Sequence, residues 1–246
     1  MALCERRDEY LIRSFDTDCN FNLKPSAILG CFQESAGMHA EDLGVGEFDL
    51  RPRGLFWVLN KIYVEVDRLP RWRETVTVFT FPHVPSAVIY ERSFRMTDAN
   101  GESLVRAVSR WAVLNTAGRI MPSSRVQFPE DCEFIGERPV RETPDWTIPI
   151  PDRRDAPAFE ITIGNSEYDQ NMHVNNIHYA DYLFNCFPAE ELKKRRIRSF
   201  QLHYIRMSHE GDTLRFYREE TAPGDFTLVG VKNGAEEVVA SRIRLE

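Results

Sequence analysis

Hydrophobic positions in the first half of the chain change from a helical period to a strand-like one. Ile28, Phe32 and Ala36 recur at helical spacing, which predicts a helix with one apolar face. Pro25 suits the first turn of this helix and Gly44 suits its end. The segments that follow are rich in β-branched and aromatic residues and are separated by turn residues, which predicts strands at 56–66, 74–81, 87–96 and 104–114.

The second half repeats this order. Asn175 or Asn176 can cap a helix. Its inward stripe consists of Ile177, Ala180, Leu183, Phe184 and Phe187. Strands are then predicted at 200–204, 213–218, 226–232 and 237–245. A short strand, one helix and several antiparallel strands, occurring twice, predict an α+β fold of two tandem modules, each a helix wrapped by a curved antiparallel sheet.

A proline-rich segment separates the two halves. It carries Pro129, Pro139, Pro144, Pro149, Pro151 and Pro157. Many charged residues lie between these prolines, and neither the helical nor the strand period is present. We therefore predict an N-terminal module at 1–128, an interdomain linker at 129–157 and a C-terminal module at 158–246.

Composition excludes several classes of protein. With 246 residues, 42% of them hydrophobic, the chain can bury a sizeable core, which excludes global disorder. Its apolar runs are far shorter than the roughly 20 residues that span a bilayer. The formal charge of −7 argues against nucleic acid as the main partner, because phosphate binding needs clustered positive charge. The charged start of the chain lacks the apolar core of a secretory signal, so we expect a cytoplasmic protein.

The cysteines give no sign of a disulfide framework or a zinc site. They are Cys4, Cys19, Cys31, Cys132 and Cys186. Their number is odd, they are widely scattered, and no pair has the C-x-x-C spacing. We therefore expect reduced, mostly structural thiols.

Polar side chains gather just before the second predicted helix. Asp169, Asn171 and His173 are spaced by two, so in an extended backbone all three leave on one face. The start of the following helix adds free backbone N–H groups, which suit stabilisation of an oxyanion. An acid, an amide and an imidazole in this pattern indicate a catalytic site. The alternative is a turn with a helix cap and a hydrogen-bonded structural histidine. Neither a G-x-S-x-G elbow nor a Walker-type glycine loop occurs.

A similar polar pattern occurs in the first half. The run DTDCNFN at Asp16–Asn22 can be aligned with DQNMHVN at Asp169–Asn175, and a predicted helix follows both. In this alignment Asn20 stands at the position of His173, and asparagine cannot act as a base. We therefore expect one active site per chain, in the second module.

The polar segment resembles the signature of a known family. The sequence HVNN at 173–176, after Asp169 and Asn171, is similar to that of the acyl-acyl carrier protein thioesterases of plant plastids and bacteria. Landmarks of the first half resemble that family in order and spacing: FQESA at 32–36, WVL at 57–59, LPRW at 69–72 and RW at 110–111. The similarity covers nearly the whole chain and is weakest in the linker.

This resemblance implies a double hot-dog fold and the hydrolysis of fatty acyl-acyl carrier protein thioesters, with release of free fatty acid, by Asp169, Asn171 and His173. It also implies that the first module holds most of the acyl tunnel. Candidates for its lining are Ile28, Phe32, Ala36, Phe56 and Val58, with ordinary core packing as the alternative. Family members often have a glutamate on the strand after the second helix, where this chain has Met207. Glu210 lies three residues further on, and a regular strand would point it to the opposite face.

Other functions stay open at this point. An acyl-CoA thioesterase would use the same residues and differ only in what holds the carrier. A hot-dog enoyl hydratase is disfavoured, because no glycine follows His173 and its spacing from Asp169 is too short. A non-catalytic acyl-binding protein is conceivable because Met207 replaces the glutamate. We expect no metal or organic cofactor, and we leave a homodimer open.

A basic cluster predicts where the carrier docks. It consists of Lys193, Lys194, Arg195, Arg196 and Arg198. The cluster follows the helix that comes after the proposed catalytic loop, and acyl carrier proteins are acidic, so complementary charge would select them. A solvated helix end is the alternative interpretation.

Overall fold

The computed structural model describes residues 4–151 and 156–246; residues 1–3 of the predicted first module and 152–155 of the predicted linker lie outside the described residues. In chain order the elements are β1 (Arg6–Leu11), η1 (Ser14–Asp16), α1 (Pro25–Asp42), α2 (Glu47–Leu50), η2 (Arg51–Arg53), β2 (Leu55–Val66), β3 (Thr75–Pro82), β4 (Tyr90–Thr97), β5 (Ser103–Asn115), η3 (Ser123–Arg125), β6 (Phe159–Thr162), η4 (Asn165–Glu167), α3 (Asn176–Phe184), α4 (Ala189–Leu192), β7 (Ile197–Tyr204), β8 (Thr213–Ala222), β9 (Asp225–Lys232) and β10 (Glu236–Leu245).

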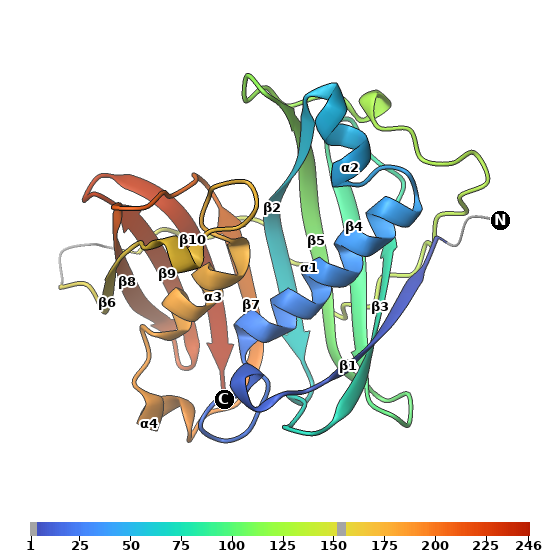
Figure 1. Ribbon diagram of the computed structural model, residues 1–246. Helices are drawn as coiled ribbons and strands as arrows, with labels where there is room; N and C mark the ends of the chain where they lie inside the picture. The colour runs from blue at the N-terminus through green and yellow to red at the C-terminus, as the bar shows by residue number, and fades with distance from the viewer. Residues whose placement is uncertain (1–3, 152–155) are drawn as a thin grey trace.

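All the strands in these ranges belong to one antiparallel sheet. Their order is β1-β3-β4-β5-β2-β7-β10-β9-β8-β6, so each half of the chain supplies one half of the sheet. The halves meet where β2 pairs with β7, from Lys61 opposite His203 to Glu65 opposite Ser199. Figure 1 shows α1 lying across the first half of the sheet and α3 across the second. The predicted α+β fold, a helix against a curved antiparallel sheet done twice, is confirmed.

Local chemistry explains where the two long helices begin and end. Proline has no N–H to leave unpaired, so Pro25 opens α1. The chain leaves α1 through Gly44, whose φ of 65° lies in the left-handed region that favours glycine. The side chain of Asn175 caps α3 by accepting the N–H of Ile177 at 3.2 Å. Phe187, predicted for the inward stripe of the helix, lies beyond its end but is buried.

The core lies between the sheet and the two helices. Ile28 and Phe32 of α1 are buried there, and Phe32 stacks on Phe94 of β4 with ring centroids 4.7 Å apart. The two helices contact each other, and they begin at opposite ends of the sheet, α1 at the lower end of Figure 1 and α3 at the upper end. The loop that precedes each helix is therefore placed at a different end of the molecule.

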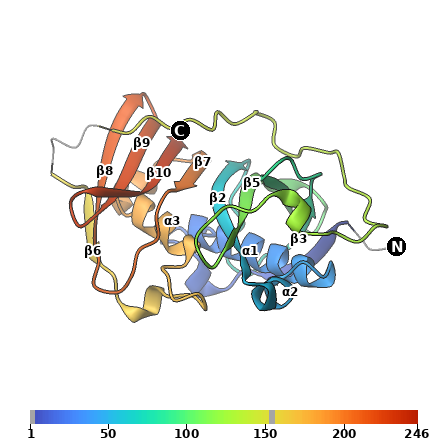
Figure 2. The same cartoon turned by 90° about the horizontal axis from the view of Figure 1, so that it is seen from above.

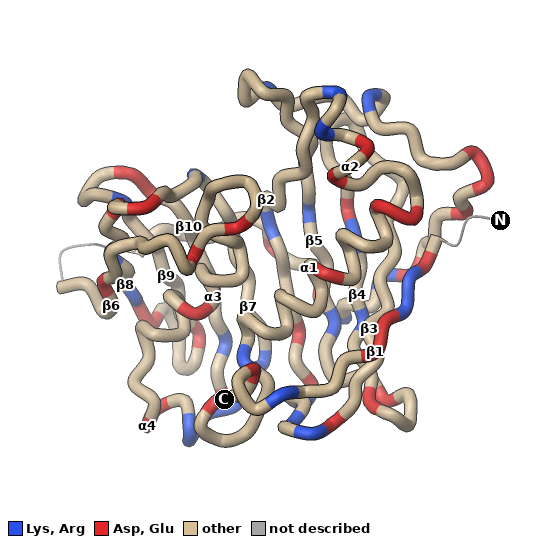
Figure 3. The backbone as a smooth tube through the Cα atoms, viewed as in Figure 1, with Lys and Arg blue, Asp and Glu red and all other residues tan. Residues whose placement is uncertain are grey.

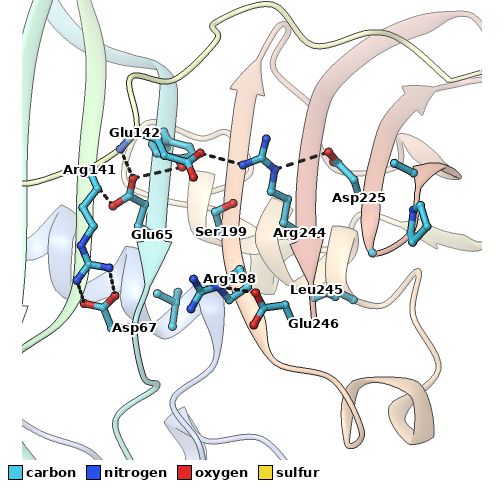
Figure 4. A pocket seen from close by; sticks show the side chains of 15 residues that line it. Glu65, Asp67, Arg141, Glu142, Arg198, Ser199, Asp225, Arg244, Leu245 and Glu246 are labelled. Atoms are coloured by element: carbon cyan, nitrogen blue, oxygen red, sulfur yellow. Dashed lines mark hydrogen bonds and ion pairs between the residues drawn. The ribbon is translucent and has the colours of Figure 1, made fainter.

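The segment between the halves crosses the other face of the sheet (Figure 2). Backbone N–H groups of Arg141 and Glu142 donate to the Glu65 carboxylate of β2 at 2.9 and 2.8 Å. Glu142 also pairs with Arg244 of β10 at 2.9 Å, so the segment is held to both halves. Figure 4 shows these contacts in an outer cavity of about 440 Å³, which none of the predicted catalytic residues lines.

The structure corrects the expectation for the cysteines. Cys4 and Cys132 form a disulfide, although 128 positions separate them and no spacing in the sequence indicates the pair. Cys19, Cys31 and Cys186 are free. In the part of the chain that the structure describes, no helix is both long and apolar enough to cross a membrane.

Candidate active site

The segment from Asp169 to His173 is a tight turn, not the extended strand that the two-residue spacing predicted. The N–H of Asp169 donates to the carbonyl of His173 at 2.9 Å, and the N–H of Met172 donates to the carbonyl of Asp169 at 3.1 Å. Met172 takes a φ of 61°, in the left-handed region. The positions of the Asp169, Asn171 and His173 side chains are therefore set by a hydrogen-bonded turn in the connection between β6 and α3.

This turn borders an open cavity of about 840 Å³. Asp169, Asn171 and His173 all line it, so the structure brings the predicted catalytic residues to one site. Residues of β2 and β5 from the first half also line the cavity, including Phe56 and Val58 of β2. Both halves of the chain thus build the cavity, and its apolar wall suits a hydrocarbon chain.

Asp169 holds the backbone of the turn. Its carboxylate accepts the N–H of Asn171 at 2.8 Å. Among the described residues no hydrogen bond joins the side chains of Asp169 and His173. The carbonyl end of the Asn171 side chain accepts a long contact of 3.5 Å from Arg51, on the short helix η2. This contact leaves the amide NH₂ of Asn171 as the end that can donate into the cavity.

His173 is half-buried beside a second histidine. Its ring meets that of His209 edge to face, with centroids 5.2 Å apart. Burial lowers the pKa of His173 below its ordinary value, the neighbouring His209 lowers it further, and Asp169 raises it. The net effect is downward, so the His173 imidazole is neutral near pH 7 and can accept a proton.

His209 is a residue that the sequence reasoning missed. A signal for it existed in the sequence, since it lies two positions after Met207, where members of the family often have a glutamate. The period of a strand had placed Glu210 on the face opposite Met207. β7 ends at Tyr204, so that period does not apply. Glu210 is exposed and outside the cavity lining, and its N–H donates to the hydroxyl of Tyr168.

Buried contacts tie the turn to the segment after β7. The N–H of Val174 donates to the carbonyl of Ser208 at 3.2 Å. The Tyr179 hydroxyl, on α3, donates to the Ser208 hydroxyl at 2.9 Å, and both residues are buried. Burial raises the pKa of Tyr179 to about 12, so it stays a neutral donor. These bonds fix His173 and Met207 relative to each other.

The predicted acyl-lining residues separate into two groups. Phe56 and Val58 line the cavity that contains His173. Ile28, Phe32 and Ala36 do not, because α1 packs their side chains into the core against the sheet. For these three the structure favours the alternative, core packing.

The predicted docking cluster lies away from the site. Lys193, Arg195 and Arg196 line a different cavity, near α4. Lys194 is exposed, and Arg198 faces the outer cavity of Figure 4, where it pairs with Glu246 at 3.1 Å. The expectation that the cluster borders the entrance to the His173 site is therefore corrected. A nine-residue helix is about 13 Å long, and α3 carries the chain away from the turn over that distance.

The structure also corrects the register of the internal repeat. Isolated bridges join Thr17 to Leu23 in the first half and Tyr168 to Val174 in the second. Within these equivalent turns, the residue with positive φ is Phe21 at 62° and Met172 at 61°. The alignment proposed from the sequence is therefore shifted by two positions.

In the structural register, Asp18 corresponds to Asp169, Asn20 to Asn171 and Asn22 to His173. The carboxylate of Asp18 accepts the N–H of Asn20 at 2.7 Å, as Asp169 does for Asn171. The first half thus keeps the acid and the amide and lacks the histidine. The residue in place of histidine is Asn22, where the sequence alignment named Asn20.

No three His, Cys, Asp or Glu side chains gather into a metal-binding group within 4–151 and 156–246. The tandem modules, with an Asp-Asn-His turn beside an apolar cavity, define a double hot-dog protein. The chain belongs to the acyl-ACP thioesterase family. The model of that family's N-terminal domain matches residues 5–126, and the model of its C-terminal domain matches residues 154–242.

Relatives of this family are similar along most of the chain. A palmitoyl-acyl carrier protein thioesterase of Cuphea hookeriana is 29% identical over 211 residues, or 81% of this chain and 51% of that protein. A dodecanoyl-[acyl-carrier-protein] hydrolase of Cinnamomum camphora is 27% identical and covers 81% of this chain and 55% of its own length. This chain thus spans about half the length of these relatives, both of which are named as chloroplastic.

Solved structures agree with the fold over the whole chain. An acyl-ACP thioesterase from Bacteroides thetaiotaomicron matches with a TM-score of 0.91 at 27% identity, covering 99% of this chain and 98% of that one. A 12:0-ACP thioesterase from Umbellularia californica matches with a TM-score of 0.85 at 23% identity, covering 99% and 97%. The second match supports the fold alone.

Proposed function

We propose that this protein hydrolyses fatty acyl-acyl carrier protein thioesters to free fatty acid and carrier thiol, and so ends or diverts fatty acid synthesis. The observation that carries the proposal is that Asp169, Asn171 and His173 line one cavity with an apolar wall, where burial lowers the pKa of His173. The names of the relatives support the substrate class. In this proposal residues 158–246 supply the catalytic turn, residues 1–128 supply the acyl-binding wall, and residues 129–157 link them.

In the proposed reaction His173 takes a proton from a water molecule that attacks the thioester carbonyl. Negative charge then develops on the carbonyl oxygen, where the NH₂ of Asn171 stabilises it. The C–S bond breaks as the tetrahedral intermediate collapses, and His173 returns the proton to the leaving thiolate. Water, the acyl group and the carrier thiol account for all atoms, and no cofactor enters.

Asp169 and Arg51 serve as positioning residues in this proposal. Asp169 holds the backbone of the turn, and its charge opposes the lowering of the His173 pKa. Arg51 engages the carbonyl end of Asn171, which turns the donor end toward the substrate. His209 sits where it favours the neutral form of His173.

The carrier is proposed to dock at the opening of the His173 cavity. Arg51 and Arg206 line this cavity and are exposed, and the exposed Arg53 lies next to them on η2. Figure 3 shows basic segments at this upper end of the sheet, around α2. These arginines take the docking role that the sequence assigned to the cluster after α4. Opposite charges chiefly raise the association rate and select the partner.

Two further expectations concern where the protein is located in the cell and whether it forms a dimer. A cytoplasmic location stays a prediction. A homodimer also stays a prediction.

The test of the proposed function is to offer C8 to C18 acyl groups on acyl carrier protein and on CoA, and to follow the release of free thiol. Hydrolysis of acyl carrier protein substrates with the higher kcat/KM supports the proposal. Preference for acyl-CoA would assign a different carrier to the same site. Binding of both substrates without thiol release would instead make the protein a non-catalytic acyl-binding member of its family.

A further inference from the structure

A second large cavity lies at the end of the sheet opposite the His173 site. Its volume is about 1060 Å³. The turn before α1, the connection after β2, the end of α3, helix α4 and the start of β7 all contribute to its walls. The second cavity shares no lining residue with the cavity of His173.

The second cavity is the structural counterpart of the proposed active site. In the first half the N–H of Leu23 donates to the carbonyl of Pro70 at 2.7 Å, as Val174 donates to Ser208 in the second half. This pair of bonds sets the equivalence, so the residue after Pro70, Arg71, corresponds to His209. An isolated bridge places Asn22 opposite Arg71, where His173 faces His209 in the other half.

The counterpart has lost the base and gained a cation. Asn22 stands in the place of His173, and an amide cannot take a proton from water. Arg71 stands in the place of His209 and is positively charged at every physiological pH. Leu69 replaces Met207 and keeps the wall apolar. The second cavity therefore has an apolar wall and lacks the histidine that the proposed hydrolysis needs.

Unpaired cations surround the second cavity. Lys24, Arg71 and Arg196 line it, and within 4–151 and 156–246 their side chains form no ion pair or hydrogen bond. Figure 3 shows basic segments along this lower edge of the molecule. By contrast, Lys193 and Arg195 pair with glutamates of their own segment, at 2.7 and 3.6 Å.

Two of the three acidic side chains that line the second cavity already have hydrogen-bond or ion-pair partners. The carboxylate of Asp18 accepts two backbone N–H groups of its own turn, at 2.7 and 2.9 Å. Asp67 forms ion pairs with Arg106 and with Arg141. Asp181 also lines the cavity, so three unengaged cations face one further carboxylate. The cavity therefore presents net positive charge to a ligand.

The second cavity also has apolar lining residues. Phe184 and Phe187 are buried, and Leu69, Leu192 and Ile197 complete the surface. A ligand that satisfies both parts of the cavity has one anionic group and a long hydrocarbon chain. The unpaired guanidinium groups of Arg71 and Arg196 match the planar fork of a carboxylate.

We propose that the second cavity is a binding site for a free long-chain carboxylate, with the headgroup at Arg71 and Arg196 and the chain against Phe184 and Phe187. The site binds without turnover, because Asn22 replaces the histidine. It is separate from the proposed hydrolytic function, since no residue is shared between the two cavities. A fatty acid at this position would contact both halves of the chain, from the turn before α1 to the end of α3.

The test measures the number of dodecanoate molecules that bind per chain, below the micelle concentration, by isothermal titration calorimetry. Two sites are expected in the parent protein, one in each cavity. Arg71→Glu combined with Arg196→Glu should weaken one of them by about tenfold or more, because a charge-assisted contact is lost with each residue. The matched control, Lys194→Glu with Arg198→Glu, makes the same charge change outside the cavity and should keep both sites.

Cys19 provides an independent readout, because it is exposed, free and part of the lining of the second cavity. Dodecanoate should slow its alkylation by N-ethylmaleimide, followed by peptide mass spectrometry, and uncharged dodecanol should protect it less. Absence of dodecanoate binding in the parent, binding left unchanged by the Arg71 and Arg196 reversals, or an unchanged Cys19 rate would each overturn the proposal. Neither readout requires turnover, so failure here is distinct from failure of the proposed hydrolysis.

Discussion

Replacing Asn171 by alanine tests the proposed oxyanion contact, and the internal repeat supplies its matched control. Asn171→Ala removes an amide donor from the His173 cavity, whereas Asn20→Ala removes the equivalent amide from the second cavity. In both turns the aspartate carboxylate accepts a backbone N–H, which the substitution leaves in place. The two variants thus make the same local change, at the cavity with a histidine and at the cavity without one.

The expected magnitudes follow from the contacts. The Asn171 side chain is exposed and makes one long contact of 3.5 Å, to Arg51, so its removal should change the free energy of unfolding by less than about 0.5 kcal/mol. Loss of an oxyanion donor costs about 2.7–4 kcal/mol in the transition state, or roughly 10²- to 10³-fold in kcat. Asn20→Ala should leave kcat within about twofold of the parent, because its cavity lacks the base.

The assay is single-substrate thiol release from dodecanoyl-acyl carrier protein, run beside urea unfolding of each variant. A fall in kcat for Asn171→Ala with an unchanged unfolding midpoint supports the proposed contact. Two results would contradict the proposed role of Asn171. One is near-parental kcat in Asn171→Ala, and the other is an equal loss in Asn20→Ala at unchanged stability.

Three further predictions concern the base and the carrier. His173→Ala removes the proposed general base and should lower kcat by about 10²- to 10⁴-fold, with an unchanged circular dichroism spectrum. Retained activity would exclude that role. Because the pKa of His173 is lowered, kcat/KM should stay constant on acidification and fall only below about pH 6.5. His209→Gln removes a neighbour that lowers this pKa, so kcat/KM should begin to fall at a higher pH. An unchanged pH profile in this variant would contradict the influence of His209. Arg53→Glu with Arg206→Glu should reduce kcat/KM and its salt dependence for acyl carrier protein substrates, while hydrolysis of short soluble thioesters stays unchanged. The control variant Lys194→Glu should behave like the parent on both substrates. Equal loss on both substrates in the arginine variant would indicate damage to the fold.

Local sequence determined the elements of this protein. Helix starts at Pro25 and Asn176, and the strands between turns, follow from rules that act over a few residues, and the structure places them within a few positions of the prediction. The order of these elements, repeated twice, was enough for the α+β architecture. The types of residue at Asp169, Asn171 and His173 were enough to identify a candidate site.

The alignment of the two repeated turns could not be predicted from the sequence. Asp and Asn recur at several offsets in both turns, so a shift of two positions aligns polar residues almost as well. The structure fixes the register through the backbone. The bridge that closes each turn pairs Thr17 with Leu23 and Tyr168 with Val174, and each turn has one residue in the left-handed conformation, Phe21 and Met172. Composition carries no information about that pair.

Contacts between residues that are distant in the sequence depend on the tertiary structure. The antiparallel pairing of β2 with β7 sets the two helix-entry turns at opposite ends of the sheet, and α3 then carries Lys193 and Arg196 away from His173. The same pairing brings Phe56 and Val58 of the first half to the catalytic turn of the second. Sequence periodicity predicts which face of an element is apolar, but contacts between distant segments depend on how the elements pack, and that packing placed His209 beside His173 and Arg71 beside Asn22.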